Sequence, residues 1–263
     1  MDTENLKQIV RHMVQEAFVG NFAPMEAHPG MQDILPTVRY VLEHTNDHQV
    51  SFPLQFSDGE WVATIQRHAY VANERMFNTV EPGQSLRYEV LSFNRFKGNA
   101  IAQQHSQANI ASILAQAQGD VSVESAPRQY IQTGKGSLPP DDACDLVRNL
   151  IEAGIAGNYA AFEGHSAFKD MIPEIERRRA SSSLVQVSFP LQFSDGEWVA
   201  SRTVWQQTAK GEMFGVDATG KELEFEVLMV HRIANGAVVD GRDFADMRTI
   251  QQQLGIASPE PQQ

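Results

Sequence analysis

Cysteine is almost absent from this chain, with Cys144 the single example among 263 residues. A lone cysteine excludes an internal disulfide and any metal site built from several thiolates. Its surroundings, "DDACDLVRNLI", have the apolar spacing of a helix, so we expect a packed core thiol rather than a nucleophile.

Long hydrophobic runs and basic clusters are missing as well. No stretch of eighteen apolar residues occurs, and the start "MDTENLKQIV" lacks the apolar core of a signal peptide, so we expect a cytoplasmic protein without a membrane segment. The 21 Lys and Arg are outnumbered by 33 Asp and Glu, which gives a net charge of −12. Because nucleic-acid binding depends on clustered positive charge, we expect no nucleic-acid partner.

Motifs for cofactors and metals are also missing. The sequence has no glycine-rich phosphate loop, no histidines and carboxylates at metal-ligand spacing, and no complete nucleophile elbow. We therefore expect neither a cofactor nor a metal ion. The apolar fraction of 42% is nevertheless that of a globular protein with a substantial core.

An internal repeat dominates what is present. The fifteen residues "QVSFPLQFSDGEWVA" occur at 49–63 and again, unchanged, at 186–200. An offset of 137 positions aligns residues 1–117 with 138–254 without a gap, and about a fifth of the pairs outside the identical stretch also match. We interpret this as a tandem duplication, with a first copy at 1–117, a linker at 118–137, a second copy at 138–256 and a disordered tail at 257–263.

Each copy has the same order of predicted elements. An amphipathic helix opens it, at 4–18 and at 143–156, and a Gly-Asn pair ends that helix. The repeated stretch alternates apolar and polar residues before an "SDG" turn, which predicts a β-hairpin. Further strands are predicted at 86–96 and at 222–233, the latter with a hairpin into 237–247. This order predicts an α+β fold in which helices pack on one face of a curved antiparallel sheet.

The end of the second copy carries short features in a distinctive order. They are Gly211, Phe214, Gly215, Thr219-Gly220-Lys221, Arg232, Asn235-Gly236, Asp246 and Gln253-Leu254-Gly255. In this order they resemble the SnoaL-like polyketide cyclases, members of the nuclear-transport-factor-like or cystatin-like superfamily. The resemblance reaches the first copy only through the internal repeat. It implies two tandem cone-shaped domains, in each of which a curled sheet surrounds a pocket that the N-terminal helices close.

The resemblance also implies a catalytic residue. In these cyclases an Asp near the end of the last strand acts as acid and base in an aldol ring closure that needs no cofactor, and Asp246 falls at that position. The first copy has Asn109 there. Because an amide cannot take up a proton at neutral pH, only the second copy is expected to retain the chemistry.

Strand alternation suggests partners for Asp246. Without a bulge, residues 237–247 place Val238, Asp240, Arg242, Phe244 and Asp246 on one face, and residues 222–233 place Leu223, Phe225, Val227, Met229 and His231 on one face. If both faces look into the cone, His231 and Arg242 join Asp246 as catalytic residues, and the apolar surroundings raise the carboxyl pKa. The expected pocket walls are Asp240, Phe244, Met229, Val227, Phe225, Trp205, Met213 and Phe214.

Other readings of these residues stay open. The charged residues of 237–247 can instead form ion pairs on an exposed face. An Asp–Arg–Asp grouping also resembles, weakly, the limonene-epoxide-hydrolase branch of the same superfamily, which activates water to open an epoxide. His28 and His165 occur in both copies, so we expect a helix-end or packing contact from them rather than copy-specific catalysis.

Two functions from different classes follow. The first is a cofactor-independent cyclase or isomerase that acts on a hydrophobic carbonyl compound in the second cone. The second is a non-catalytic protein, built as a fused pseudo-dimer, that binds an apolar small molecule or serves as a scaffold. The identical fifteen residues reflect either a shared environment at a pseudo-two-fold contact or a recent copying event between the halves.

Overall fold

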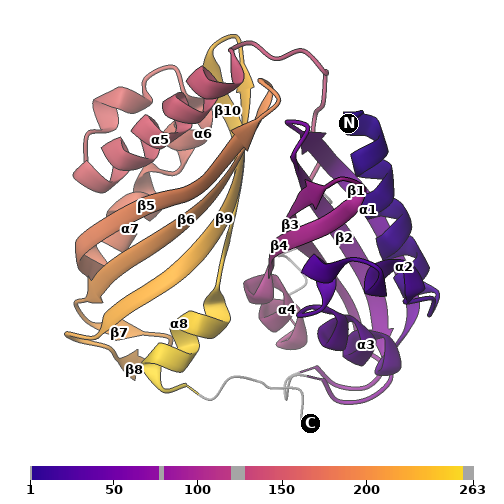
Figure 1. The fold of residues 1–263 in the computed structure, drawn as a ribbon. Helices are drawn as coiled ribbons and strands as arrows, with labels where there is room; N and C mark the ends of the chain where they lie inside the picture. Colours follow the sequence, from indigo (N-terminus) through magenta and orange to yellow (C-terminus); the bar gives the residue numbers. More distant parts are fainter. Residues whose placement is uncertain (1, 77–79, 120–127, 257–263) are drawn as a thin grey trace. The chain divides into compact units, whose positions relative to one another are not determined.

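The computed structural model describes residues 2–76, 80–119 and 128–256, and it divides the chain into two units (Figure 1). The main part of the first unit is Met1–Ile131, and the second unit is Gln132–Ser258. Each unit packs helices against a four-stranded antiparallel sheet. The predicted α+β fold of two tandem domains is therefore confirmed. The expected tail at 257–263 and the middle of the expected linker, 120–127, lie outside the described residues.

The first unit begins with helices and ends with a sheet and one more helix. Its sheet has the order β1-β2-β3-β4, in which every neighbouring pair is antiparallel. The elements are α1 (Thr3–Phe18), α2 (Ala23–Glu26), the 3-10 helix η1 (Pro29–Met31), α3 (Leu35–Glu43), β1 (Thr45–Ser57), β2 (Trp61–Ala72), β3 (Ser85–Lys97), β4 (Ala100–Ala108) and α4 (Ile110–Ala117).

The second unit repeats this order, with a small additional hairpin. Its main sheet has the order β10-β9-β6-β5, and β7 pairs with β8 alone. The elements are α5 (Pro140–Ala156), the 3-10 helix η3 (Tyr159–Phe162), α6 (Ser166–Asp170), α7 (Ile172–Ser181), β5 (Ser182–Ser194), β6 (Trp198–Ala209), β7 (Glu212–Met213), β8 (Val216–Asp217), β9 (Glu222–Ala234), β10 (Ala237–Ala245) and α8 (Met247–Leu254).

The opening helices supply the cores that the sequence predicts. Helix α1 buries an apolar stripe against its sheet, and α5 does the same, with Cys144 among its buried residues. The thiol is free and buried, so the expectation of a core cysteine is confirmed. Helix α5 ends at Gly157, whose φ of 77° lies in the left-handed region that glycine adopts at little cost.

The repeated stretch forms the hairpins β1–β2 and β5–β6, as predicted. In both turns an aspartate caps the backbone: Asp58 accepts from the N–H groups of Glu60 and Trp61, and Asp195 accepts from those of Glu197 and Trp198. The glutamates of the two turns nevertheless have different surroundings. Glu60 is half-exposed, whereas Glu197 is buried, so identical sequence does not reflect identical surroundings here.

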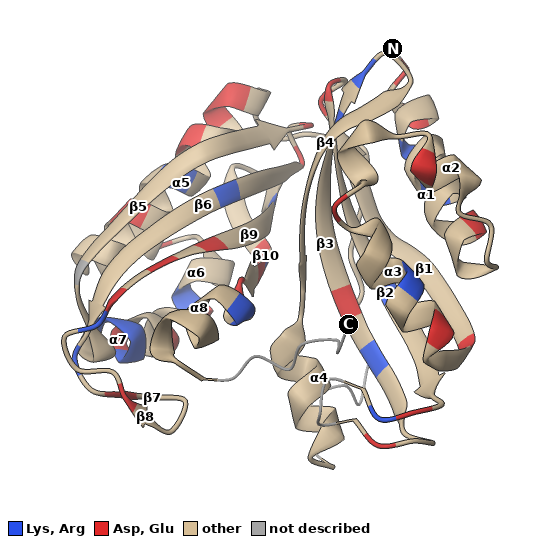
Figure 2. Ribbon diagram, turned by 60° about the horizontal axis from the view of Figure 1, so that its bottom comes forward, with Lys and Arg blue, Asp and Glu red and all other residues tan. Residues whose placement is uncertain are grey.

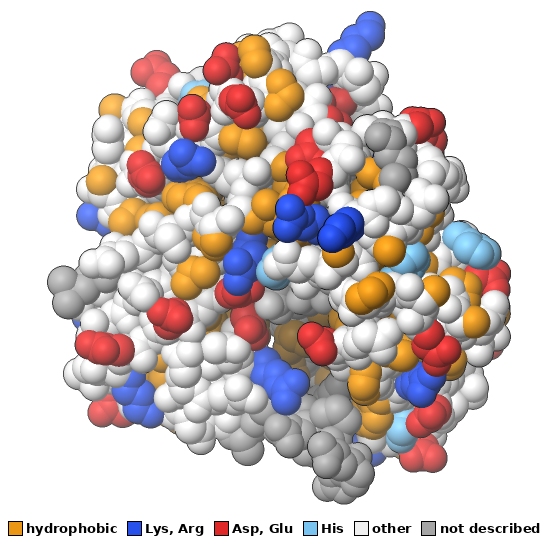
Figure 3. All heavy atoms as spheres, in the orientation of Figure 1, with side chains coloured by type: hydrophobic (Ala, Val, Ile, Leu, Met, Phe, Trp, Pro, Cys, Tyr) orange, Lys and Arg blue, Asp and Glu red, His pale blue; other side chains and the backbone are white. Residues whose placement is uncertain are grey.

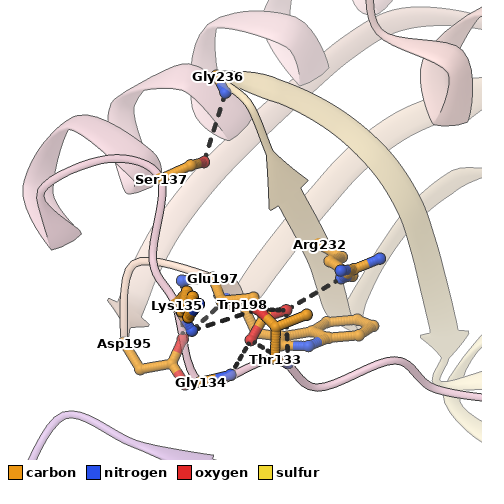
Figure 4. A network of polar contacts seen from close by, with 9 residues as sticks. All are labelled: Thr133, Gly134, Lys135, Ser137, Asp195, Glu197, Trp198, Arg232 and Gly236. Carbon is orange, nitrogen blue, oxygen red and sulfur yellow. Dashed lines mark hydrogen bonds and ion pairs between the residues drawn. The ribbon is translucent and has the colours of Figure 1, made fainter.

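Residues 133–137 of the expected linker are bound to the second unit. The carboxylate of Glu197 accepts hydrogen bonds from the N–H groups of Thr133 and Gly134 and from the Thr133 hydroxyl, at 2.8 to 3.0 Å (Figure 4). Arg232 Nε lies 3.2 Å from the same carboxylate. Ser137 adds a bond to the backbone of Gly236. Residues 133–137 therefore form an ordered strap that is bound to the β5–β6 turn at Glu197 and to the β9–β10 turn at Gly236.

Charge is spread over the whole chain. Figure 2 shows Lys and Arg interspersed with Asp and Glu on the helices and strands of both units. The face drawn in Figure 3 likewise has hydrophobic side chains among charged ones. Within the described ranges, no helix combines the length and the hydrophobicity needed to span a membrane.

Candidate active site

The candidate site lies on the β9–β10 hairpin, and a bulge decides which residues it contains. Val238 pairs with Ile233, but Asp240 pairs with Arg232, so an extra residue is inserted between Val238 and Asp240. A bulge of this kind reverses the alternation of side chains beyond it. Residues after the bulge therefore point to the face opposite the one that simple alternation predicts.

The bulge separates two sets of residues that the sequence predicts to lie together. Val227, Met229 and Val238 pack with helices α5 and α6, on the face that the helices cover. Paired residues of antiparallel strands point to the same face. Since Asp240 pairs with Arg232, Arg242 with Val230 and Phe244 with Leu228, these three residues lie on the other face. The expectation that Asp240, Arg242 and Phe244 share a face with His231 is therefore wrong, and Asp246 lies beyond the end of β10, where it is the N-cap residue of α8.

His231 is the central polar residue of the helix-covered face. Its side chain is 6% exposed and stacks on Phe168, with the ring centroids 5.3 Å apart. Burial lowers the pKa of His231 to about 4, and the nearby carboxylates of Asp243 and Asp240 oppose this shift only partly. The imidazole is therefore neutral at pH 7. Its buried Nδ1 has no hydrogen-bond partner.

Gly241 makes room for this ring. It pairs with His231 across the two strands, and a Cβ at position 241 would lie 2.7 Å from His231 Cδ2. Such a distance is shorter than any ordinary contact, so only glycine fits without moving the ring. The absence of a side chain at 241 thus fixes where the imidazole lies.

Asp243 belongs to this site although the sequence did not predict it there. It pairs with Met229, so it lies on the face of His231 and is a diagonal neighbour of that residue. Among the opposing effects on the pKa of His231, that of Asp243 is the largest. Arg178 lies 3.5 Å from its carboxylate. The sequence could have indicated Asp243 only if a bulge after Val238 had been assumed, because the bulge places Asp243 on the face of His231 in place of Asp240 and Arg242.

Asp246 has a structural contact at the expected end of the last strand. Its side chain caps α8: one oxygen accepts from the N–H of Thr249 at 3.0 Å and the other from the Thr249 hydroxyl at 2.6 Å. In the first unit Asn109 caps α4 in the same way, by accepting from the N–H of Ser112 at 3.1 Å. The Asp and the Asn thus share a capping role, whatever else Asp246 does.

The expected wall residues fall into three groups. Trp205, Phe225, Val227 and Met229 belong to the cluster beneath the helices, with His231 on the same face. Met213 packs in a separate cluster with Leu223 and α8. Phe214 is 51% exposed, so the expectation that it lines the pocket is wrong. Arg242 lies with its guanidinium 5.8 Å from the ring of Phe244, on the other face.

A family comparison bears on this unit. Residues 142–254 match the family model of the SnoaL-like polyketide cyclases. The second unit is a SnoaL-like domain. No curated protein matches the chain.

Solved structures similar to this chain include three bacterial proteins. AclR from Streptomyces galilaeus is 20% identical, with a TM-score of 0.40, and the match covers 44% of this chain and 96% of that one. IdmH from Streptomyces antibioticus is 21% identical, with a TM-score of 0.39 and coverage of 43% and 97%. A SnoaL-like polyketide cyclase from Agrobacterium tumefaciens is 12% identical, with a TM-score of 0.39 and coverage of 42% and 96%.

The SnoaL-like domain differs from the first unit at both polar positions of the site. With the offset of 137, Asn94 stands in the place of His231 and Ser106 in the place of Asp243. Neither an amide nor an aliphatic hydroxyl ionises near neutral pH, so neither can replace an imidazole or a carboxylate as acid or base. The histidine–aspartate pair is therefore present at these positions of the SnoaL-like domain and not at those of the first unit.

The histidines common to both copies have the structural role that the sequence predicts. His165 Nδ1 accepts from the backbone N–H of Val238 at 3.1 Å, and His28 Nδ1 accepts from that of Ile101 at 3.3 Å. Each histidine precedes a short helix and ties it to the last strand of its sheet. In the described parts of the chain, no three His, Cys, Asp or Glu side chains are grouped so as to hold a metal ion.

Proposed function

We propose that the SnoaL-like domain is a cofactor-independent acid/base enzyme that cyclises or isomerises a hydrophobic carbonyl compound by aldol-type chemistry. One observation carries the proposal: a buried, neutral His231 lies beside Asp243 on an apolar face under the helices. The first unit, with Asn94 and Ser106, has no such pair. The family match to polyketide cyclases supports the class of substrate.

The two residues divide the chemistry between them. The carboxylate of Asp243 takes a proton from the carbon next to a carbonyl, and the electron pair of that C–H bond becomes an enolate. The neutral imidazole of His231 donates a hydrogen bond to the carbonyl oxygen as that oxygen gains charge. The enolate carbon then bonds to a second carbonyl carbon, whose oxygen recovers the proton from Asp243. For an isomerisation the proton returns instead to a different carbon.

The apolar surroundings of His231 and Asp243 would bind the substrate and keep water away from it. Trp205, Phe225 and Met229 form apolar walls around the place of the reacting carbon. The one polar group among them, the Trp205 N–H, already donates to the Thr203 hydroxyl at 2.9 Å. Such walls bind a hydrophobic substrate and exclude water, which strengthens the hydrogen bond to the developing oxyanion.

Proton exchange tests the proposal without knowledge of the natural substrate. The probe is 2-tetralone in D2O, whose exchange of α-protons for deuterium is followed by NMR. We expect the full chain to accelerate exchange, and Asp243→Asn and His231→Phe each to reduce the acceleration by about a hundredfold or more. Ser106→Ala, the matched change in the first unit, should have no effect.

Asp246 is compared directly in the same assay. Asp246→Asn preserves a capping oxygen, as Asn109 does in the first unit. We expect it to leave exchange unchanged. Loss of exchange in Asp246→Asn but not in Asp243→Asn would show that Asp246 is the base, as the family resemblance implies, and would refute the assignment to Asp243.

A non-catalytic binding protein is the second candidate. The engagement of both Asp246 oxygens with Thr249 favours it, because the carboxylate that the resemblance marks as the base already has a structural partner. Binding of 2-tetralone by the full chain without any acceleration of exchange would support this candidate over the enzyme.

We also propose that the two units associate as a pseudo-dimer within one chain. The tandem duplication supports this, since two-fold pairing is the commonest arrangement of like subunits. A protease site inserted between residues 123 and 124 tests it. The two halves should elute together from a sizing column after cleavage, and separate elution would refute the pairing.

A further inference from the structure

The first unit has a polar aromatic interior that its counterpart lacks. Five rings contact one another in a closed circuit: Phe18–His48 at 5.5 Å, His48–Tyr70 at 5.8 Å, Tyr70–Tyr88 at 5.7 Å, Tyr88–His68 at 5.2 Å and His68–Phe18 at 4.9 Å between centroids. We name these five residues the histidine–tyrosine cluster. The tyrosines and His68 are buried, with exposed fractions of 8% or less.

The hydrogen bonds of the two histidines fix which nitrogen carries the proton. His48 Nε2 lies 2.6 Å from the Thr45 hydroxyl, which itself donates to the backbone carbonyl of Val41, and 3.1 Å from the backbone carbonyl of Thr45. His68 Nε2 lies 3.2 Å from the side-chain carbonyl of Gln66. A carbonyl oxygen can only accept, and the Thr45 hydroxyl has already given its proton to Val41, so Nε2 is the donor in both rings. Burial lowers the pKa of His48 and brings that of His68 to about 3, which keeps both rings neutral. Nδ1 of each ring is therefore a bare acceptor.

Both of these acceptors are buried and lack a partner. The same is true of Asn94 Oδ1, which is linked to His68 through a chain of hydrogen bonds. In that chain Asn94 and Gln66 both donate to the hydroxyl of Ser92, at 3.3 Å. Buried polar atoms almost always have a hydrogen-bond partner. His68 Nδ1 and Asn94 Oδ1 belong to this one network, and His48 is joined to His68 through the ring contacts with Phe18. Unpartnered buried acceptors on neighbouring rings indicate a place that a ligand with donors would complete.

The second unit has no equivalent. Under the 137-residue offset, Val185 replaces His48, Trp205 replaces His68, Phe225 replaces Tyr88 and Met229 replaces Ser92. The interior of one copy is thus apolar with a single histidine, whereas that of the other offers acceptors between aromatic rings. The two interiors therefore differ in the chemical groups that they would offer to a bound molecule.

We propose that the interior of the first unit is a separate binding site for a neutral aromatic compound that bears at least two hydroxyl groups. Its hydroxyls donate to Nδ1 of His48 and of His68, and the amide oxygen of Asn94 accepts from a third donor where one exists. Its ring lies among Phe18, Tyr70 and Tyr88, which favour flat apolar surfaces. The two histidines are neutral and the other three residues carry no charge, so nothing within the cluster calls for a charged ligand. The site is independent of the proposed chemistry of the SnoaL-like domain.

Paired probes test this site on the full chain. Calorimetry compares 1,3-dihydroxynaphthalene with 1,3-dimethoxynaphthalene, which has the same ring but no donors. We expect the diol to bind and the dimethoxy compound to bind at least about tenfold more weakly, because it leaves the acceptors unpaired. His48→Phe and His68→Phe should each weaken diol binding by about tenfold. Trp205→Phe, the change at the equivalent position of the second unit, should not.

A second measurement covers the case in which a variant fails to fold. With ¹⁵N-labelled histidine in the wild-type chain, the Nδ1 resonances of His48 and His68 should move toward hydrogen-bonded values when the diol is added. No binding of the diol at millimolar concentration, equal binding of both probes, or binding unaffected by either histidine variant would overturn the proposal. The proposal would also be overturned if the Nδ1 chemical shifts already indicate hydrogen bonds to water before the diol is added and do not change when it is added.

Discussion

Replacing Glu197 with alanine should destabilise the second unit far more than the same change at Glu60 destabilises the first. The two residues occupy the same position of the fifteen-residue repeat, so sequence context is matched. The Glu197 side chain is 3% exposed and accepts from Thr133, Gly134 and Arg232 (Figure 4). The Glu60 side chain is 53% exposed and pairs with Arg95, which is 50% exposed.

The magnitudes follow from these surroundings. Removing Glu197 leaves Arg232, whose side chain is 14% exposed, without the carboxylate and frees the strap at Thr133. Breaking a buried ion pair by removing one partner costs about 3–5 kcal/mol. An exposed pair such as Glu60–Arg95 contributes about 0–1 kcal/mol. Glu197→Ala should therefore lower the free energy of unfolding of its unit by about 3 kcal/mol more than Glu60→Ala.

Hydrogen exchange resolved to peptides measures both units in one sample. Protection of β5–β6 should fall in Glu197→Ala, and protection of β1–β2 should stay near the wild-type value in Glu60→Ala. Glu197→Gln is an informative intermediate, because it keeps the shape and one acceptor but loses the charge. If the two alanine variants lose the same amount of stability, then the burial of Glu197 is not what makes it more stabilising than Glu60.

Three further results are expected for the second unit. Gly241→Ala should destabilise it by about 1–3 kcal/mol in urea unfolding, because the new Cβ would lie 2.7 Å from His231; no loss would mean that the ring moves freely. Asp246→Ala should lower the stability of α8 by about 1 kcal/mol, measured by hydrogen exchange, while Asp246→Asn stays near zero, as the cap made by Asn109 indicates; equal effects would contradict the capping role. The unfolded His231 takes up a proton near pH 6.5 and the folded one only near pH 4, so stability should fall by on the order of 3 kcal/mol as the pH drops through this window. His231→Phe should remove that part of the pH dependence, and an unchanged slope would show that the buried ring is not its source.

Much of the fold could be predicted from the sequence because its signals are local or repeated. The offset of 137 residues reveals two copies, and the alternation in the repeated stretch predicts the hairpins β1–β2 and β5–β6. The turn role of Asp58 and Asp195 also follows from local chemistry, since a short carboxylate beside glycine caps its own turn. These features need no knowledge of tertiary contacts.

The candidate site was only partly predictable because its geometry depends on one inserted residue. His231 and the apolar residues of β9 lie before the bulge, and their shared face was predicted correctly. Beyond Val238 the alternation reverses, so Asp243 replaces Asp240 and Arg242 on that face. A bulge at this point leaves no mark in local residue preference.

The burial of individual side chains could not be predicted from the sequence either. Glu60 and Glu197 have identical neighbours in sequence and opposite exposure, because only Glu197 is covered by the strap at Thr133. The polar interior of the first unit was likewise not expected. Its histidines lie on β1 and β2 and become neighbours only through strand pairing and through contact with Phe18 of α1.

A crystal structure of the chain with bound 2-tetralone would show directly whether His231 and Asp243 together contact the reacting atoms of a ketone. We expect the ketone under the helices of the second unit, with its carbonyl oxygen within about 2.7–3.2 Å of the imidazole of His231 and its α-carbon against the carboxylate of Asp243. A ketone bound against Asp246 at the start of α8, or an interior around His231 that is packed solid and admits no ligand, would contradict the assignment to His231 and Asp243.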